Sequence, residues 1–125
     1  MCSLYARLGG GDAIRAAVDE YFDRLLGDPE LARYFAGRDV GRLARHLRPF
    51  LAAAFGGPDL YRGRDMLAAH AGMGITNAHF DRAVRHLVAV LAGMGVDQEA
   101  LDDVAAMLEP LRALIVQAPL ARLAA

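Results

Sequence analysis

Apolar residues recur at spacings of three and four along each long segment of this chain, which is the periodicity of an amphipathic α-helix. In the first such segment, residues 12–27, the apolar stripe consists of Ile14, Ala17, Val18, Tyr21, Phe22, Leu25 and Leu26. The sequence has no strand-like alternation, internal repeat or low-complexity tract. The pattern therefore predicts an all-α fold.

Three more long helices follow from the same periodicity and from residues suited to helix ends. We expect a helix from Val40 with Asp39 as its N-cap, a helix to about Gly93 capped by Thr76 or Asn77, and a last helix after Asp97. Their stripes contain Val40, Leu43, Leu47, Phe50, Leu51 and Ala54; Phe80, Ala83, Val84, Leu87, Val88 and Leu91; and Leu101, Val104, Ala105, Leu108, Leu111, Leu114 and Ile115.

Prolines and glycines divide these helices from shorter elements. Pro49 and Pro110 predict bends, because proline removes a helical hydrogen bond. One short helix should follow the break at 27–29 and carry Leu31, Tyr34 and Phe35. A second should span Met66 to His70, after a glycine-rich loop at 56–64.

Length and charge limit the class of protein. The 125 residues suit a single domain, 1–125, and a formal net charge of -1 gives no electrostatic reason to bind nucleic acid. The uncharged stretch at 87–96 is about half of what a bilayer span requires, so no membrane segment is expected. The N-terminus lacks a secretory signal pattern, and Cys2 is the only cysteine, so we expect a cytoplasmic location.

The four histidines are the main candidates for chemistry. None of the pairs among His46, His70, His79 and His86 has the spacing or the cysteine company of a zinc site. His79 and His86 would lie about 10 Å apart along one helix, so we expect surface or boundary positions for them. Nucleophilic catalysis has little support, because the only serine and the only cysteine lie at the N-terminus.

The setting of His70 points to a cofactor. It ends a short apolar stretch and is followed by Gly72 and Gly74, which allow a sharp turn after it. A heme needs an axial imidazole on a positionable segment, a flat apolar slot, and cations or hydroxyls near its propionates. The sequence offers candidates for each of these.

Four stretches in order, LYARLGGGDAI, DPELARYF, FLAAAFGGPDLYRGRDM and AHAGMGITNAHFD, resemble the successive motifs of group I truncated hemoglobins of the cyanobacterial, algal and mycobacterial type. The similarity covers nearly the whole chain. It implies a two-over-two helical sandwich around heme. It also implies that His70 is the proximal iron ligand and that Phe35 stacks near the porphyrin.

The resemblance implies a set of heme-lining positions. These are Phe22, Phe35, Arg42, Leu43, His46, Leu47, Phe50, Tyr61, Arg64, Met66, Met73, Ile75 and Phe80. On the distal side this chain departs from the family, since the positions matching Phe22, Leu43 and Leu47 carry tyrosine or glutamine in many relatives. Tyr21 should not replace the missing donor, because one residue is about 100° around a helix. Retention of dioxygen should therefore be weak.

Two interpretations of His46 stay open. In some cyanobacterial and algal relatives the matching histidine is the sixth iron ligand; alternatively, the side chain lies at the mouth of the pocket. Some of these relatives also attach heme covalently to a late histidine, but this chain has Gln117 at about that place. We therefore expect non-covalent heme b.

The resemblance leaves three functions to distinguish. The first is binding of dioxygen, carbon monoxide or nitric oxide to iron. The second is electron transfer or redox sensing by a heme bound to both His70 and His46. The third is nitric oxide dioxygenation, which needs an external reductase, because the sequence has no flavin or nicotinamide motif. A helical interaction module without cofactor is the alternative outside these classes.

Overall fold

A computed structural model describes residues 4–56 and 74–116. Over these residues all regular structure is helical, as predicted. The elements are α1 (Leu4–Leu8), α2 (Gly11–Leu26), α3 (Pro29–Ala32), α4 (Val40–Ala54), α6 (Asn77–Gly93), α7 (Gln98–Leu108) and α8 (Arg112–Ile115), with 3-10 turns at Arg33–Phe35 and Glu109–Leu111.

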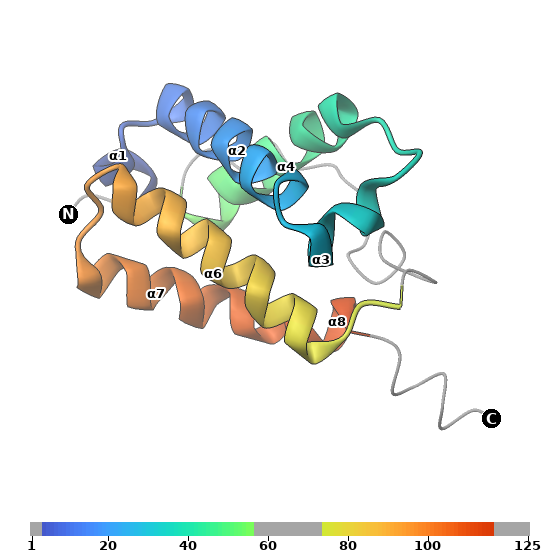
Figure 1. The fold of residues 1–125 in the computed structure, drawn as a ribbon. Coiled ribbons are helices and arrows are strands. Elements are labelled where there is room, and N and C mark those ends of the chain that lie inside the picture. Colours follow the sequence, from blue (N-terminus) through green and yellow to red (C-terminus); the bar gives the residue numbers. More distant parts are fainter. Residues whose placement is uncertain (1–3, 57–73, 117–125) are drawn as a thin grey trace.

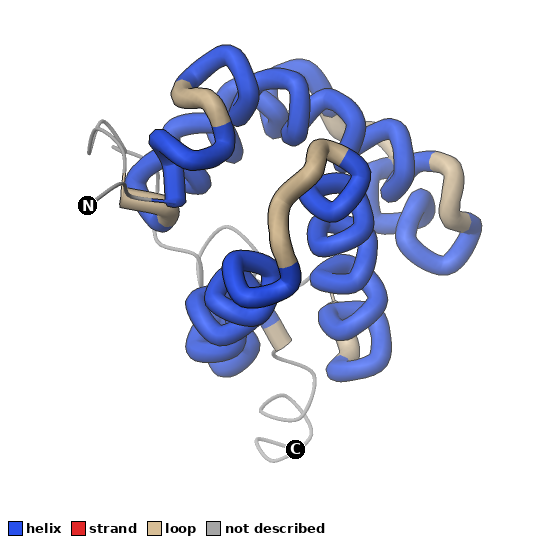
Figure 2. The backbone as a smooth tube through the Cα atoms, turned by 90° about the vertical axis from the view of Figure 1, so that its left-hand side faces the viewer, coloured by secondary structure: helices blue, strands red, loops and turns tan. Residues whose placement is uncertain are grey.

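The four long helices form two layers of two (Figure 1). One layer contains α2 and α4, and the other contains α6 and α7, which run in opposite directions and are joined by a short turn. The layers meet where α2 packs on α6. Figure 2 shows the two layers from the side. This arrangement is the predicted two-over-two sandwich.

Side-chain caps set the starts of three of the four long helices, α4, α6 and α7, whereas α2 begins after Gly10 without one. The Asp39 carboxylate accepts from the N–H of Arg42 at 3.1 Å, and the Asp97 carboxylate accepts from the N–H of Ala100 at 2.9 Å. Thr76 caps α6, because its hydroxyl accepts from the N–H of His79 at 3.1 Å. Each cap satisfies a backbone donor that the first helical turn leaves free.

Three details of the helices differ from or refine the sequence prediction. α1 is an additional helix, and the N–H of Tyr5 ties it to the carbonyl of Phe55 at 2.8 Å. Leu26, expected in the apolar stripe of α2, is 42% exposed, because it lines an open hollow beside α4 while the adjacent Leu25 is the one buried in the core. Near Pro110 the last helix changes to a 3-10 turn, which agrees with the expected bend.

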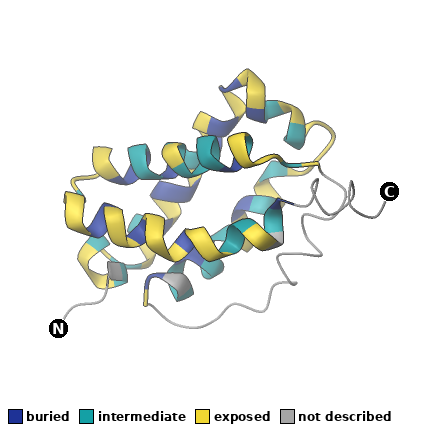
Figure 3. Ribbon diagram, turned by 90° about the horizontal axis from the view of Figure 1, so that it is seen from below, coloured by how far each residue is buried: buried dark blue, intermediate teal, exposed yellow. Residues whose placement is uncertain are grey.

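The core lies between the two layers. Figure 3 shows buried positions on the inward faces and exposed positions on the outward faces of the helices. The buried cluster joins side chains of α2, α4, α6 and α7 with Leu31 and Phe55, and its most deeply buried members are Val18, Leu51, Val90, Leu91 and Val104. These residues anchor the helices from which the candidate site is built.

Candidate functional site

The apolar face of α4 is only partly covered. Leu43, Leu47 and Phe50 lie along this face and are half-buried against the edge of the core, whereas Leu51 is fully buried. Among the described helices, α2 is the one against which α4 packs extensively, and its contacts with α6 and α7 are minor. The result is a strip of apolar side chains that faces the other layer without being closed by it.

An aromatic pair packs near the start of α4, where Phe22 lines a hollow together with Val40 and Ala44. The rings of Phe22 on α2 and Phe35 in the 3-10 turn are 5.7 Å apart and meet edge to face at 78°. Phe22 is buried, while Phe35 is half-buried and packs on the core. Edge-to-face contacts favour a fixed ring orientation. The two rings therefore form a rigid aromatic contact beside α4.

Tyr21 lies beside this pair without joining the strip. Its ring is 6.0 Å from that of Phe22 and tilted by 59°. Burial raises the pKa of the Tyr21 phenol far above its ordinary value, so the hydroxyl stays protonated at neutral pH. The hydroxyl is thus neutral, and the neighbouring Phe22 offers no donor.

Arg42 and His46 are exposed residues of α4 beside the apolar strip. They lie one turn apart, because residues four positions apart share a helix face. No ion pair or hydrogen bond from either side chain is made to the described residues. Both groups are therefore available at the border between the strip and solvent.

Ile75 and Phe80 lie at the start of α6, in the layer opposite α4. Ile75 is half-buried in the segment just before the helix, and Phe80 is buried in the first turns. The guanidinium of Arg112 lies over the ring of Phe80 at 4.6 Å from its centre, which covers that face of the ring. Arg112 also bonds to Asn77 at 3.0 Å and to Asp81.

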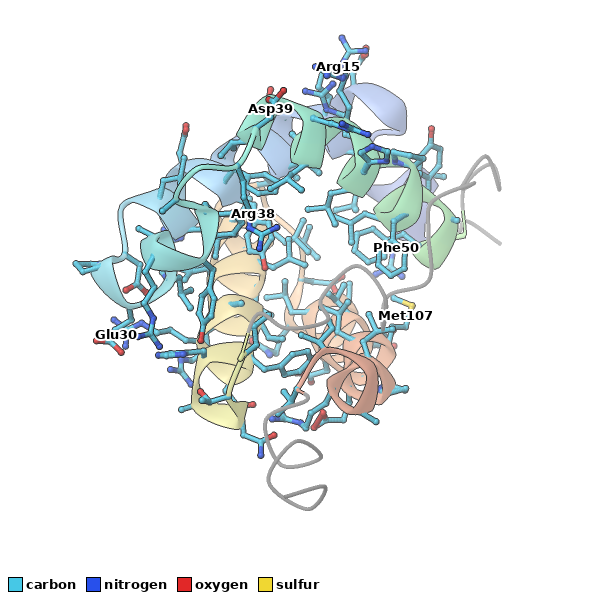
Figure 4. All side chains as sticks on the ribbon, turned by 90° about the vertical axis from the view of Figure 1, so that its right-hand side faces the viewer. Arg15, Glu30, Arg38, Asp39, Phe50 and Met107 are labelled. Atoms are coloured by element: carbon cyan, nitrogen blue, oxygen red, sulfur yellow. The ribbon has the colours of Figure 1, made fainter. Side chains whose placement is uncertain are left out.

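Met107 of α7 is a residue of this region that the sequence did not single out. Figure 4 shows Phe50 and Met107 projecting toward each other from the two layers. Met107 is one of the large apolar side chains that stay exposed in the described part of the chain. Met107 is three residues from Val104 and four from Leu111, which puts it at the edge of the apolar stripe of the last helix. This spacing is the sequence pattern from which its position could have been predicted.

The hollow between α2 and α4 has a volume of about 350 Å³. Phe22 and Val40 line it, together with Ala44 and Arg48, which lie on a different side of α4 from Leu43 and Leu47. Asp19 and Arg48 form an ion pair at 3.0 Å across it. The hollow is partly charged and open, so it does not suit a large apolar cofactor.

The two histidines of α6 occupy boundary positions, as expected, and both have partners. The side chain of His79 is 12% exposed, with Nε2 3.1 Å from Glu30 and Nδ1 2.6 Å from the Tyr34 hydroxyl. His86 contacts Asp28 through Nε2 at 2.8 Å and Arg24 through Nδ1 at 3.3 Å. Both therefore serve the contact between α6 and the α2–α3 region.

Several predicted site residues lie outside the described residues. These are Tyr61, Arg64, Met66, His70 and Met73, together with the expected short helix of Met66 to His70. Across residues 4–56 and 74–116, no group of three or more histidine, cysteine or acidic side chains is placed to hold a metal ion. In the same residues, no helix is long and apolar enough to cross a bilayer.

Comparison with known proteins places this fold in a family. The model of the bacterial-like globin family matches residues 3–117. The group 1 truncated hemoglobin GlbN of Synechocystis sp. is 39% identical over 111 residues, which cover 86% of this chain and 90% of that protein.

Comparison with solved structures indicates the same family. Truncated hemoglobin from Tetrahymena pyriformis in its Fe(III) form superimposes with a TM-score of 0.88 at 31% identity, covering 92% of this chain and 98% of that one. The 2/2 hemoglobin of Synechococcus sp. PCC 7002, solved in the cyanomet state with covalently attached heme, gives 0.86 at 33% identity, covering 93% and 99%. The chain belongs to the bacterial-like globin family and, within it, to the group 1 truncated hemoglobins.

Proposed function

We propose that this chain binds heme b non-covalently, with His70 as the proximal ligand, and that its function is the binding of diatomic ligands. The observation that carries the proposal is the half-buried apolar strip of α4, which faces the other layer in a globin fold. A bound heme would supply an iron at which dioxygen, carbon monoxide or nitric oxide can bind.

The side chains of the strip fit a flat apolar group. Leu43, Leu47 and Phe50 offer hydrocarbon surface from one layer, and the Phe22–Phe35 pair adds fixed rings beside α4. Burying such surface contributes about 25 cal/mol per Å², so a macrocycle that covers the strip would be held firmly. The exposed guanidinium of Arg42 lies at the border between the strip and solvent, where it could pair with the carboxylate of a heme propionate.

The histidine contacts favour His70 and His46 as the residues that face iron. His79 and His86 are both engaged with acidic and aromatic side chains of the α2–α3 region. His46, by contrast, is exposed and has no partner among the described residues. An axial ligand must offer a free ring nitrogen, so two of the four histidines are poor candidates.

The distal residues determine which ligands are retained. The side chains of Phe22, Leu43 and Leu47 carry no hydrogen-bond donor, so they exclude water without holding a polarised ligand. Retention of bound carbon monoxide depends little on such donors, whereas retention of bound dioxygen depends on them strongly. Simple ligand binding therefore fits these residues better than nitric oxide dioxygenation, which would also need an external reductase.

A second candidate function is electron transfer or redox sensing with both His70 and His46 as axial ligands. The exposed side chain of His46, which has no partner among residues 4–56 and 74–116, favours this alternative. Ligation would require the ring to turn from solvent over the strip. It would then compete with any diatomic ligand for the same iron position.

Absorption spectra of the full chain with added hemin test both candidates. For the first, we expect a Soret band, rapid carbon monoxide binding to the ferrous form, and a five-coordinate ferrous spectrum. Low-spin bands in both oxidation states that vanish in His46→Ala would support the second candidate instead. Extraction with acidified ketone should remove the heme.

His70→Ala should lose the proximal coordination, and His86→Gln serves as the matched control because His86 contacts Asp28 away from the strip. Wild-type chain that fails to take up hemin would overturn the proposal. So would axial coordination that survives in His70→Ala.

A further inference from the structure

We propose that protonation of His79 switches the hydroxyl of Tyr34 from the ring of His79 to the backbone carbonyl of Gly74. The residues involved lie where the 3-10 turn after α3 meets the start of α6. The rings of Tyr34 and His79 stack edge to face, with centres 5.4 Å apart and planes at 76°. This contact fixes the hydroxyl beside the imidazole.

The Tyr34 hydroxyl has two possible acceptors. Its oxygen is 2.6 Å from Nδ1 of His79 and 3.5 Å from the carbonyl oxygen of Gly74. A phenolic hydroxyl carries a single hydrogen, so it can donate fully to only one of these two acceptors at a time. The protonation state of His79 decides which group receives it.

The carboxylate of Glu30 sets the tautomer of neutral His79. Nε2 of the ring lies 3.1 Å from Oε1 of Glu30, and an ionised carboxylate only accepts hydrogen bonds. Nε2 must therefore carry the hydrogen in the neutral ring, which leaves a lone pair on Nδ1. In this state the Tyr34 hydroxyl donates to Nδ1 and the Gly74 carbonyl loses its donor.

The positively charged ring reverses this arrangement. Both nitrogens of imidazolium are donors, so Nδ1–H then donates to the Tyr34 oxygen. The O–H group of Tyr34 then turns away from the His79 ring and donates its hydrogen to the Gly74 carbonyl. A continuous chain of donors then runs from His79 through Tyr34 to the backbone.

Charges around His79 act in both directions. From α3, Glu30 favours the charged ring. From the 3-10 turn, the Arg33 guanidinium opposes it, because Nη2 of Arg33 lies 3.4 Å from both Nδ1 and the Tyr34 oxygen. Farther along α6, Arg82 and His86 are paired with Asp28 rather than with His79.

Gly74 is well suited to respond to such a switch. Its φ of +70° places it in the left-handed region, and a Cβ there would have no neighbour within 4 Å. The residue therefore forms an uncrowded turn just before the Thr76 cap of α6. All the groups of the switch lie in the described part of the chain, so it does not depend on the proposed heme site.

The switch can be tested by nuclear magnetic resonance on the nitrogen-15-labelled full chain. If heme is bound, the ferrous carbon monoxide form is used because it is diamagnetic. The ring nitrogens of His79 report its protonation. The amide of Ile75, which shares a peptide bond with the Gly74 carbonyl, reports the hydrogen bond to that carbonyl. We expect both signals to shift together as the pH is varied, with one common midpoint.

In Tyr34→Phe the His79 ring should still titrate, but the Ile75 amide should no longer follow it. His86→Gln, a change to the other histidine of α6, should leave the coupling intact. If Tyr34→Phe does not fold, His79→Gln replaces it, and there the Ile75 amide should become independent of pH.

An Ile75 signal that does not shift in the wild type would overturn the proposal. An equal shift in Tyr34→Phe or His79→Gln would do the same. Failure of His70 to bind iron would leave the switch unaffected, so the two proposals fail separately.

Discussion

Asp28 accepts a hydrogen bond from Nε2 of His86 at 2.8 Å, although the two residues are 58 positions apart in the chain. The same carboxylate accepts from Nε of Arg82 and from the backbone N–H of Glu30 at 3.0 Å. With a side chain only 5% exposed, Asp28 both caps α3 and joins it to α6. One carboxylate therefore holds the short helix that precedes Phe35.

Replacing this carboxylate should lower stability in a pH-dependent way. The hydrogen bonds from Arg82 and then from His86 hold the pKa of Asp28 well below its ordinary value, while burial acts in the opposite direction. An unfolded aspartate titrates near about 3.9, so the stabilisation is complete above that pH and is lost as the pH falls toward the folded-state pKa. Asp28→Asn should lower Tm by several degrees at pH 7, and by progressively less below about pH 4.

Thermal unfolding followed by circular dichroism checks this prediction. Asp19→Asn is the matched control, because Asp19 pairs with Arg48 at the surface and such pairs contribute about 0–1 kcal/mol. A Tm difference for Asp28→Asn that is the same at pH 7 and at acid pH would contradict the assigned role.

Leu91 and Leu26 provide a contrast within one residue type. Leu91 is completely buried on α6, whereas Leu26 is 42% exposed at the end of α2. Leu91→Ala should cost about 2–5 kcal/mol in free energy of unfolding, because it removes buried methyl groups and leaves a cavity. Leu26→Ala should change it by less than about 0.5 kcal/mol. Urea unfolding measures both, and similar losses would show that the burial assignment is wrong.

Adding donors to the apolar strip should increase retention of dioxygen. Phe22→Tyr combined with Leu43→Gln introduces a hydroxyl and an amide at the positions where relatives are expected to have them. Hydrogen bonds to strongly polarised groups contribute about 1.5–3 kcal/mol, so dioxygen dissociation should slow by about ten- to a hundred-fold. Stopped-flow displacement by carbon monoxide measures this rate. An equal change in carbon monoxide dissociation would indicate a steric effect instead.

Arg112 should hold the end of the last helix on α6. Its guanidinium bonds to Glu109 at 2.8 Å and to Asp81, and it covers the ring of Phe80. In Arg112→Gln, hydrogen exchange should accelerate in α8 and in the first turn of α6 while α2 stays protected. Arg85→Gln, at an exposed site on α6, is the control and should leave exchange unchanged. Uniform acceleration over the whole chain would argue against a local role.

The fold was largely predictable because its signals are local. Periodicity and capping residues identified the four long helices, and Asp39, Thr76 and Asp97 cap as expected. α1 was not predicted, because five residues before a glycine run carry too little periodicity. The exposure of Leu26 depends on the open hollow that is left between α2 and α4, which is a tertiary property.

The candidate site was predictable in part. Periodicity placed Leu43, Leu47 and Phe50 on one face of a helix, but that this face would stay half-covered depends on how the layers pack. The contacts of His79 and His86 join residues 45 or more positions apart, so no local pattern could show them. The role of His70 comes from family resemblance and stays a prediction.

The one-sided packing of α4 has a consequence for the life of the protein in a cell. Among the described helices α4 packs extensively on α2 alone, and a helix whose apolar face is half-covered is only marginally stable until another surface covers it. Any molecule that binds between the layers stabilises the folded state by mass action. We therefore expect newly made chains to be exposed to proteases until the cofactor arrives, so that cofactor supply, rather than translation, limits how much protein accumulates.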